Sequence, residues 1–288
     1  MEFGFLTRDL DIADGDFAIR TIGDWRTARA DLEAGGHVVN GWFYMPRKLN
    51  SPEPAGRYQL PITHDLQSAK YSDPDLQRFV VIVLGFLLGL RLLPEGWGHL
   101  HGAAIEVGKC NGFNLFDREI IPCLERAAVF QIANANGRNV KRLESAISLI
   151  HWSKGQEQHF DTFSYLYSAI DACWAAFANL HAGSIAQLKP KRGVSHAERP
   201  VIMQQVLRLK LPRIFDPTSA VTAASIRNDL IHEGMVGDMP LGLSFIDPHC
   251  DLEMREFADK LILALLGVSA HYLDTPGGDR SRHVLGLR

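Results

Sequence analysis

Three polar residues near the end of a predicted helix, Arg227, Asn228 and His232, have side chains suited to phosphodiester chemistry. An arginine is a permanently charged, forked donor for a phosphate, and an imidazole can move protons near neutral pH. Helical residues advance by about 100° each, so Asn228 and His232 lie one turn apart on nearly the same face, within reach of the long Arg227 side chain. The same residues also fit an ordinary helix end, where the helix dipole favours cations.

Two acidic residues are candidate supports for this group. Glu233 follows His232 directly and either polarises it or is simply an exposed residue of the last helical turn. Asp171 stands among apolar residues of a predicted long helix. Because a buried charge needs a partner, we expect Asp171 to pair with Arg227 and hold it in place.

The most basic short stretch precedes the motif and is a candidate RNA-backbone contact. It contains Lys189, Lys191 and Arg192, followed by His196 and Arg199. A solvated loop is the commoner interpretation of such a stretch, and both remain open. The formal net charge of the chain is −3, so any contact with a nucleic acid must rely on a local basic patch.

Helical patterns dominate the chain after about Asp73 and predict a mainly α protein. Apolar residues recur every three or four positions from Phe160 to Leu180, which predicts one long amphipathic helix. The apolar run Phe79–Leu93 predicts a buried helix too short for a membrane span of ~20 residues. Cap residues followed by proline predict two further helices, from Asp216-Pro217 to Glu233 and from Asp247-Pro248 to about Tyr272. Three more helices are expected over residues 117–135, 140–152 and 197–209.

The segment before these helices has a different pattern. Residues 1–73 hold short apolar clusters between glycine and proline turns, which predicts a small β-rich or α+β module. We therefore divide the chain into this module, a helical connecting region over 74–136, a helical domain over 137–273 and a fraying tail over 274–288.

Composition indicates a globular protein, with 46% hydrophobic and 22% charged residues. The sequence shows neither a signal-peptide pattern nor a membrane span, which predicts a cytoplasmic location. The cysteines, 110, 123, 173 and 250, form no C-x-x-C pair, which predicts reduced thiols. We expect no metal ion and no cofactor.

The segment from Ser225 to Gly234 resembles the signature of the HEPN superfamily (higher eukaryotes and prokaryotes nucleotide-binding domain). That signature is an arginine, usually a polar residue next to it, and a histidine a few positions later, as in Arg227, Asn228 and His232. The ending His232-Glu233-Gly234 is similar to that of bacterial, ApeA-like members. The order of predicted helices also resembles the family over about residues 137–273, whereas residues 1–73 carry no resemblance.

The resemblance implies a metal-independent endoribonuclease of the toxin or anti-phage type. Arg227 would bind the scissile phosphate, His232 would act as general acid or base, and Asn228 would orient the site. The products would be a 2′,3′-cyclic phosphate and a 5′-hydroxyl, so DNA would be inert. The resemblance also implies a homodimer with a shared cleft and possible control by an antitoxin or another regulatory partner. The alternatives are a non-catalytic scaffold that binds nucleotides or proteins, and a helical protein of another family.

Overall fold

The computed structural model divides the chain into two compact units, Met1–Ala133 and Asn134–Arg288. The protein is 56% helical and has a small N-terminal sheet, which confirms the mainly α prediction. The residues that the structure describes are 1–35, 38–44, 60–94, 102–110, 112–135, 137–156, 158–188, 193–236, 239–240, 248–275 and 284–288.

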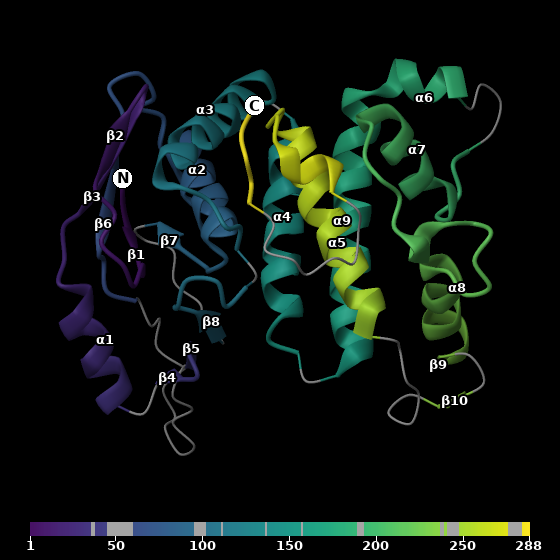
Figure 1. Ribbon diagram of the computed structural model, residues 1–288, viewed down its shortest axis with the longest axis horizontal. Helices are drawn as coiled ribbons and strands as arrows, with labels where there is room; N and C mark the ends of the chain where they lie inside the picture. The colour runs from purple at the N-terminus through teal and green to yellow at the C-terminus, as the bar shows by residue number, and fades with distance from the viewer. Residues whose placement is uncertain are drawn as a thin grey trace. The chain divides into compact units, whose positions relative to one another are not determined.

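The first unit is built on an antiparallel five-stranded sheet (Figure 1). Its strands, in spatial order, are β2 (Ile12–Asp14), β3 (Phe17–Thr21), β6 (His64–Gln67), β1 (Glu2–Gly4) and β7 (Leu93–Pro94). Phe17 and Ile19 are buried in β3 while the residues between and after them are not, as the two-residue period of a strand requires. Gly15 forms the β2–β3 turn with a φ of 53°, a left-handed conformation that suits glycine.

Two helices pack on this sheet. α2 (Pro74–Leu88) contacts α3 (Asp117–Ala133), and α3 also contacts β2 and β3. Both helices therefore belong to the first unit and do not form the connecting region that we expected over 74–136.

The apolar run Phe79–Leu93 is not one helix, contrary to prediction. α2 ends at Gly89, which has a φ of 65° and donates its backbone N–H to the carbonyls of Gly85 and Phe86. This left-handed cap turns the chain, so that Leu93 lies in β7.

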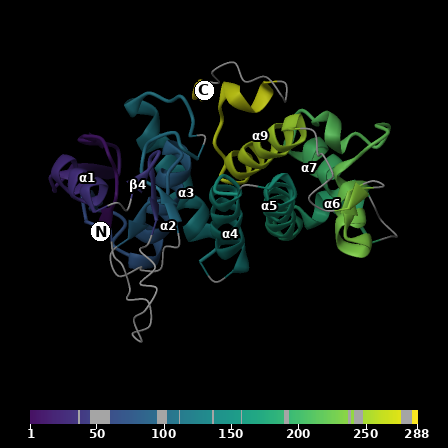
Figure 2. The same ribbon diagram turned by 90° about the horizontal axis from the view of Figure 1, so that it is seen from below.

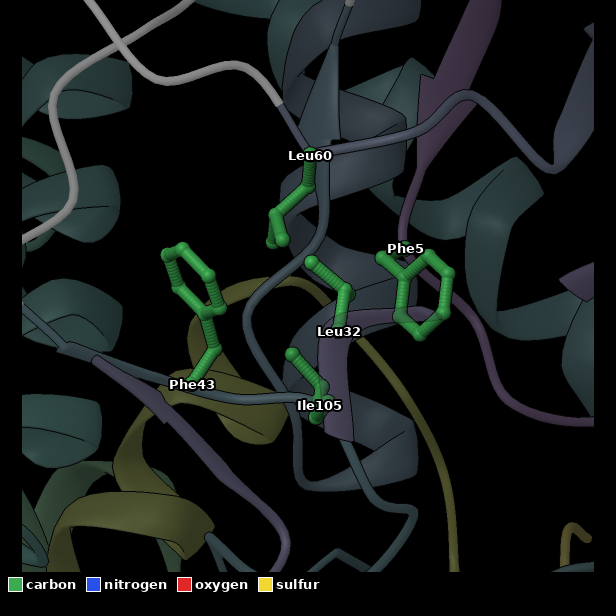
Figure 3. Packing of buried hydrophobic residues seen from close by; sticks show 5 residues of the cluster. All are labelled: Phe5, Leu32, Phe43, Leu60 and Ile105. Carbon is green, nitrogen blue, oxygen red and sulfur yellow. The ribbon is translucent and has the colours of Figure 1, made fainter. Parts of the chain in front are cut away.

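A smaller part of the first unit contains one helix and three strands. The strands are β4 (Val38–Val39), β5 (Trp42–Tyr44) and β8 (Gly102–Ala104), in that order, and the helix is α1 (Trp25–Ala34). The patterns of residues 1–73 did not predict α1, which the Asp24 side chain caps. Five buried side chains turn toward a common centre here, from Phe5, Leu32, Phe43, Leu60 and Ile105 (Figure 3).

The second unit centres on three long helices that lie side by side in Figures 1 and 2. They are α4 (Arg138–Ser153), α5 (His159–Leu180) and α9 (Pro248–Leu265). The predicted apolar face of α5 is confirmed over its middle, where Phe163, Tyr167, Ile170 and Phe177 are buried, whereas Leu180 at its end is exposed. α9 ends earlier than predicted, before Gly267, whose φ is 75°.

Shorter elements complete the second unit. They are α6 (Ala182–Leu188), α7 (Glu198–Leu207), a 3-10 turn (Arg213–Phe215), α8 (Ala223–Asn228), a π-helical segment (Asp229–Glu233) and a hairpin of β9 (Met235–Val236) with β10 (Met239–Pro240). α6 is not among the helices that the sequence predicted. α5 packs against α7 and α8, and α9 also contacts α7, so both long helices join these shorter elements to the bundle.

The C-terminal residues 284–288 do not fray, contrary to prediction. Leu287 forms a β-bridge with Ala270, Leu285 is fully buried, and Arg288 forms an ion pair with Asp274. The end of the chain is therefore held against residues that follow α9.

Candidate functional site

The helix that carries Arg227 begins later than predicted. Asp216 does not cap it, because residues 217–221 form a turn and bends, in which the Asp216 carboxylate accepts bonds from the backbone N–H and the hydroxyl of Thr218 at 2.8 and 2.7 Å. α8 begins instead at a capping box, in which Thr222 and Ser225 each bond the backbone N–H of the other, at 3.2 and 3.0 Å. The motif therefore lies on a short helix that is fixed at its start.

The second half of the motif is π-helical. Asp229–Glu233 form one π turn, and the N–H of Gly234 donates to the carbonyl of Asp229, five residues earlier. Gly234 has a φ of 63°, which ends the segment. In an α-helix, residues five apart differ by about 140° in direction at 100° per residue. Bonding over five residues reduces this difference, so the backbone brings Arg227 and His232 closer to one face than an α-helix does.

The three motif residues are accessible to solvent. Arg227 is half-buried and donates from Nη1 to Asn228 Oδ1 at 3.2 Å, while Asn228 and His232 are exposed. Ala223 and Ile226 are buried and anchor α8. Glu233 is exposed as well. The expected polarisation of His232 by Glu233 stays a prediction.

Asp171 does have a partner, but the partner is not Arg227 as predicted. Its Oδ1 accepts from Arg199 Nη1 at 2.8 Å, and its Oδ2 lies 3.3 Å from His196 Nδ1. Arg227 bonds Asn228 instead. The half-buried carboxylate on α5 therefore joins α5 to the start of α7.

The chain before α7 positions these two partners. The backbone N–H and the hydroxyl of Ser195 donate to Glu198 Oε2 at 3.0 and 2.9 Å. This turn places His196 and Arg199 on the same side, where Arg199 Nη1 lies 3.1 Å from His196 Nδ1. The Arg199 guanidinium also lies over the Trp174 ring, 5.8 Å from its centroid.

Electrostatics connect this cluster to the motif. Burial raises the pKa of Tyr167 to about 12, and the charge of Asp171 raises it further while Arg227 and Arg199 oppose this. Burial also lowers the pKa of His196, an effect that Arg199 and Arg227 strengthen and Asp171 opposes. The charge of Arg227 therefore acts on both rings, whose centroids are 6.2 Å apart.

The predicted basic stretch is only partly described. Lys189, Lys191 and Arg192 lie outside the described residues. Arg199, the last member, uses its guanidinium to bind Asp171, so part of its charge is neutralised within the protein.

Neither a metal cluster nor a membrane span is found in the part of the chain that the structure describes. No group of three or more His, Cys, Asp or Glu side chains there is arranged to hold a metal ion. Within the same residues, every helix is too short or too polar to cross a bilayer.

No protein-family model, curated protein or solved structure matches this chain.

The sequence indicated the motif and Asp171 as candidates. It placed His196 only in a basic stretch and did not predict its contacts with Asp171 and Arg199. The usable signal was Ser195-x-x-Glu198, a capping-box pattern that predicts a helix start beside His196.

Proposed function

We propose that this protein is a metal-independent endoribonuclease of the HEPN type, acting as a toxin or in anti-phage defence. The observation that carries the proposal is the arrangement of one half-buried arginine on a capped helix and one exposed histidine in the π turn that follows it directly. The π turn is the last turn of this helix and ends at Gly234.

The proposed roles follow from the chemistry of the side chains. Arg227 binds the non-bridging oxygens of the scissile phosphate through its forked donors. Asn228, which accepts a bond from Arg227 Nη1, limits the directions that the guanidinium can take. His232, exposed one π turn later, moves a proton to or from a ribose oxygen. A neighbouring 2′-hydroxyl serves as nucleophile, so the reaction needs RNA and no metal ion.

A second copy of the chain is part of the proposal. A two-fold axis would bring two motifs to one cleft through a self-complementary surface. Val221 and Ile231, which are 58% and 59% exposed on either side of Arg227, are apolar residues available for such a contact.

Cleavage of mixed RNA in excess EDTA tests the function. The unaltered protein should produce fragments with 2′,3′-cyclic phosphate ends and leave DNA intact. His232→Ala should reduce the rate by about 10²–10⁴-fold, as expected for loss of a general acid or base. Arg227→Lys keeps the charge but loses the forked geometry, so it should also be strongly impaired.

His159→Gln is a matched control, because His159 is an exposed histidine of the same unit that pairs with Asp251 at 3.1 Å and lies outside the motif. It should cleave RNA like the unaltered protein. Nucleotide binding without cleavage would contradict the enzyme and favour the non-catalytic scaffold. A monomer at micromolar concentration, measured by light scattering, would contradict the shared cleft.

A further inference from the structure

The basic segment, residues 208–215 between α7 and α8, holds three cations and no acidic residue. The cations are Arg208, Lys210 and Arg213, and residues 200–215 contain no Asp or Glu. All three side chains are exposed, and none of them forms an ion pair with an acid of the described residues. Since the whole chain has a net charge of −3, the segment is a local excess of positive charge.

Buried residues within the basic segment fix its path. Leu209 is 3% exposed, and Phe215 is 5% exposed, with its ring centroid 5.2 Å from that of Phe257 on α9. The backbone N–H of Ile214 donates to Glu253 Oε2 at 2.9 Å. The end of the segment is therefore held against α9, while its cations face the solvent.

Arg208 has a backbone conformation that an arginine rarely takes. Its φ is 57°, in the left-handed region where the cap of a helix is usually glycine or asparagine. The N–H of Leu209 donates to the carbonyl of Gln204 at 3.0 Å, and Gln204 Nε2 donates to the carbonyl of Leu209 at 2.7 Å. These bonds hold the turn in place. An arginine at a position that suits glycine indicates a role for its side chain.

The basic segment ends beside the helix that carries Arg227. The 3-10 turn Arg213–Phe215 contacts α8, and Ser219 Oγ donates to the carbonyl of Arg213 at 2.9 Å. Figure 1 shows the chain running from α7 to α8 through this segment. Five residues of chain span at most about 18 Å, which is the length of about five nucleotides at ~3.4 Å per phosphate. The three cations therefore fit one short stretch of a nucleic acid strand.

Building on the proposed ribonuclease function, we infer that Arg208, Lys210 and Arg213 bind the phosphate backbone of an RNA strand next to the Arg227 site. Three cations without acid partners match the repeated negative charge of such a backbone, and contacts to phosphates do not depend on the bases. The basic segment supplies affinity, whereas the chemistry belongs to Arg227 and His232.

Binding of a single-stranded oligonucleotide without 2′-hydroxyls measures this surface independently of cleavage. The double variant Lys210→Gln/Arg213→Gln removes two phosphate contacts. At ~0.7 per contact, the slope of log Kd against log salt should fall by about 1.4. By the same relation, binding should be about 25-fold weaker than that of the unaltered protein at about 0.1 M salt, and nearly equal at about 1 M.

Arg138→Gln/Lys141→Gln is the matched control. Both side chains lie exposed on α4 and form no ion pair with an acid of the described residues. α4 packs on α5 and α9, and Figure 1 shows it on the other side of α5 from α8. The control loses the same charge and should bind the oligonucleotide like the unaltered protein. Equal weakening in the two double variants would show an effect of net charge alone and would overturn the inference.

Arg208→Gly separates binding from folding. Glycine adopts a positive φ without strain, so the Tm should stay the same or rise. Loss of one phosphate contact should weaken binding by about fivefold at about 0.1 M salt. Unchanged binding in both Arg208→Gly and Lys210→Gln/Arg213→Gln would overturn the inference, whatever the protein does to RNA.

Cleavage of RNA distinguishes this inference from the proposed function. Lys210→Gln/Arg213→Gln should raise KM and leave kcat nearly unchanged, because the same contacts form before and during the reaction. A lower kcat with unchanged KM would overturn the binding role. Binding through the basic segment without cleavage of any RNA would overturn the ribonuclease and leave the surface in place. Binding of poly-glutamate, but of no oligonucleotide, would make an acidic protein the partner and would overturn RNA.

Discussion

The Arg199 guanidinium donates to the Asp171 carboxylate at 2.8 Å, and this one bond joins the start of α7 to the middle of α5. Both side chains are partly exposed, at 23% and 31%, and the Nε of Arg199 is buried without a hydrogen-bond partner. The ion pair therefore holds the side chains around His196 in place. Burial of the Arg199 Nε without a hydrogen bond opposes part of this stabilisation.

Arg199→Ala should lower the free energy of unfolding by about 1–2 kcal/mol, because it removes a partly screened ion pair and the contact with Trp174. Arg199→Lys keeps the charge but loses the planar contact with Trp174. Its free energy of unfolding should therefore lie between those of the unaltered protein and Arg199→Ala. Urea unfolding measures both. An Arg199→Ala protein as stable as the unaltered one would show that the pair does not contribute to folding.

Thr222→Ala should destabilise α8 by about 1 kcal/mol, since it removes the hydroxyl that caps the helix of the motif. Hydrogen exchange at residues 226–234 should become faster, while α4 should be unaffected. Thr222→Ser retains the capping oxygen and is the control. Equal protection in Thr222→Ala and Thr222→Ser would mean that the cap does not hold the motif.

Gly234→Ala should cost about 1–2 kcal/mol, because Gly234 has a φ of 63°, which a side chain disfavours. No atom lies within 4 Å of the added Cβ, so the cost comes from the backbone alone. Gly183→Ala is a matched control with equally open space but no positive φ. It lies in α6 and should be neutral or stabilising by about 0.5–1 kcal/mol. Thermal unfolding should therefore show a lower Tm for Gly234→Ala and an unchanged or higher Tm for Gly183→Ala.

The first unit should lose stability in acid because of His64. Burial lowers the pKa of this fully buried imidazole to about 4, against about 6.5 in an unfolded chain. The unfolded state then binds a proton more readily, so stability is full above about pH 6.5 and falls as the pH drops toward 4, by a few kcal/mol in total. Unfolding free energies at several pH values measure this loss.

His64→Gln should reduce the pH dependence, because an amide can still bond Thr63 and Thr21 but does not titrate. If the His64→Gln protein kept the full acid sensitivity, other groups would be responsible for it.

The sequence predicted correctly those helices whose pattern lies within the helix itself. The apolar period of α5 and the proline at the start of α9 are such signals, and both helices form. Prediction was wrong where two local signals competed. Asp216-Pro217 resembles a helix start, but Thr222 and Ser225 provide a reciprocal cap, and the helix begins there.

The composition of the site was less predictable than the motif. Arg227, Asn228 and His232 are neighbours in sequence, so helical geometry relates them directly. Asp171 and Arg199 come from different helices, and only the packing of α7 on α5 determines that they pair. Nothing in their spacing distinguishes this pairing from the predicted one with Arg227.

The π turn at Asp229–Glu233 amounts to one extra residue in a helix that otherwise follows α-helical register. Loss of a single codon, for example that of Leu230, would let the segment relax to ordinary α-helix without disturbing the cap at Thr222. His232 would keep its chemical identity but would stand four residues after Arg227. Single-residue deletions through this turn are therefore a genetic probe of spacing, separate from any change of side chain.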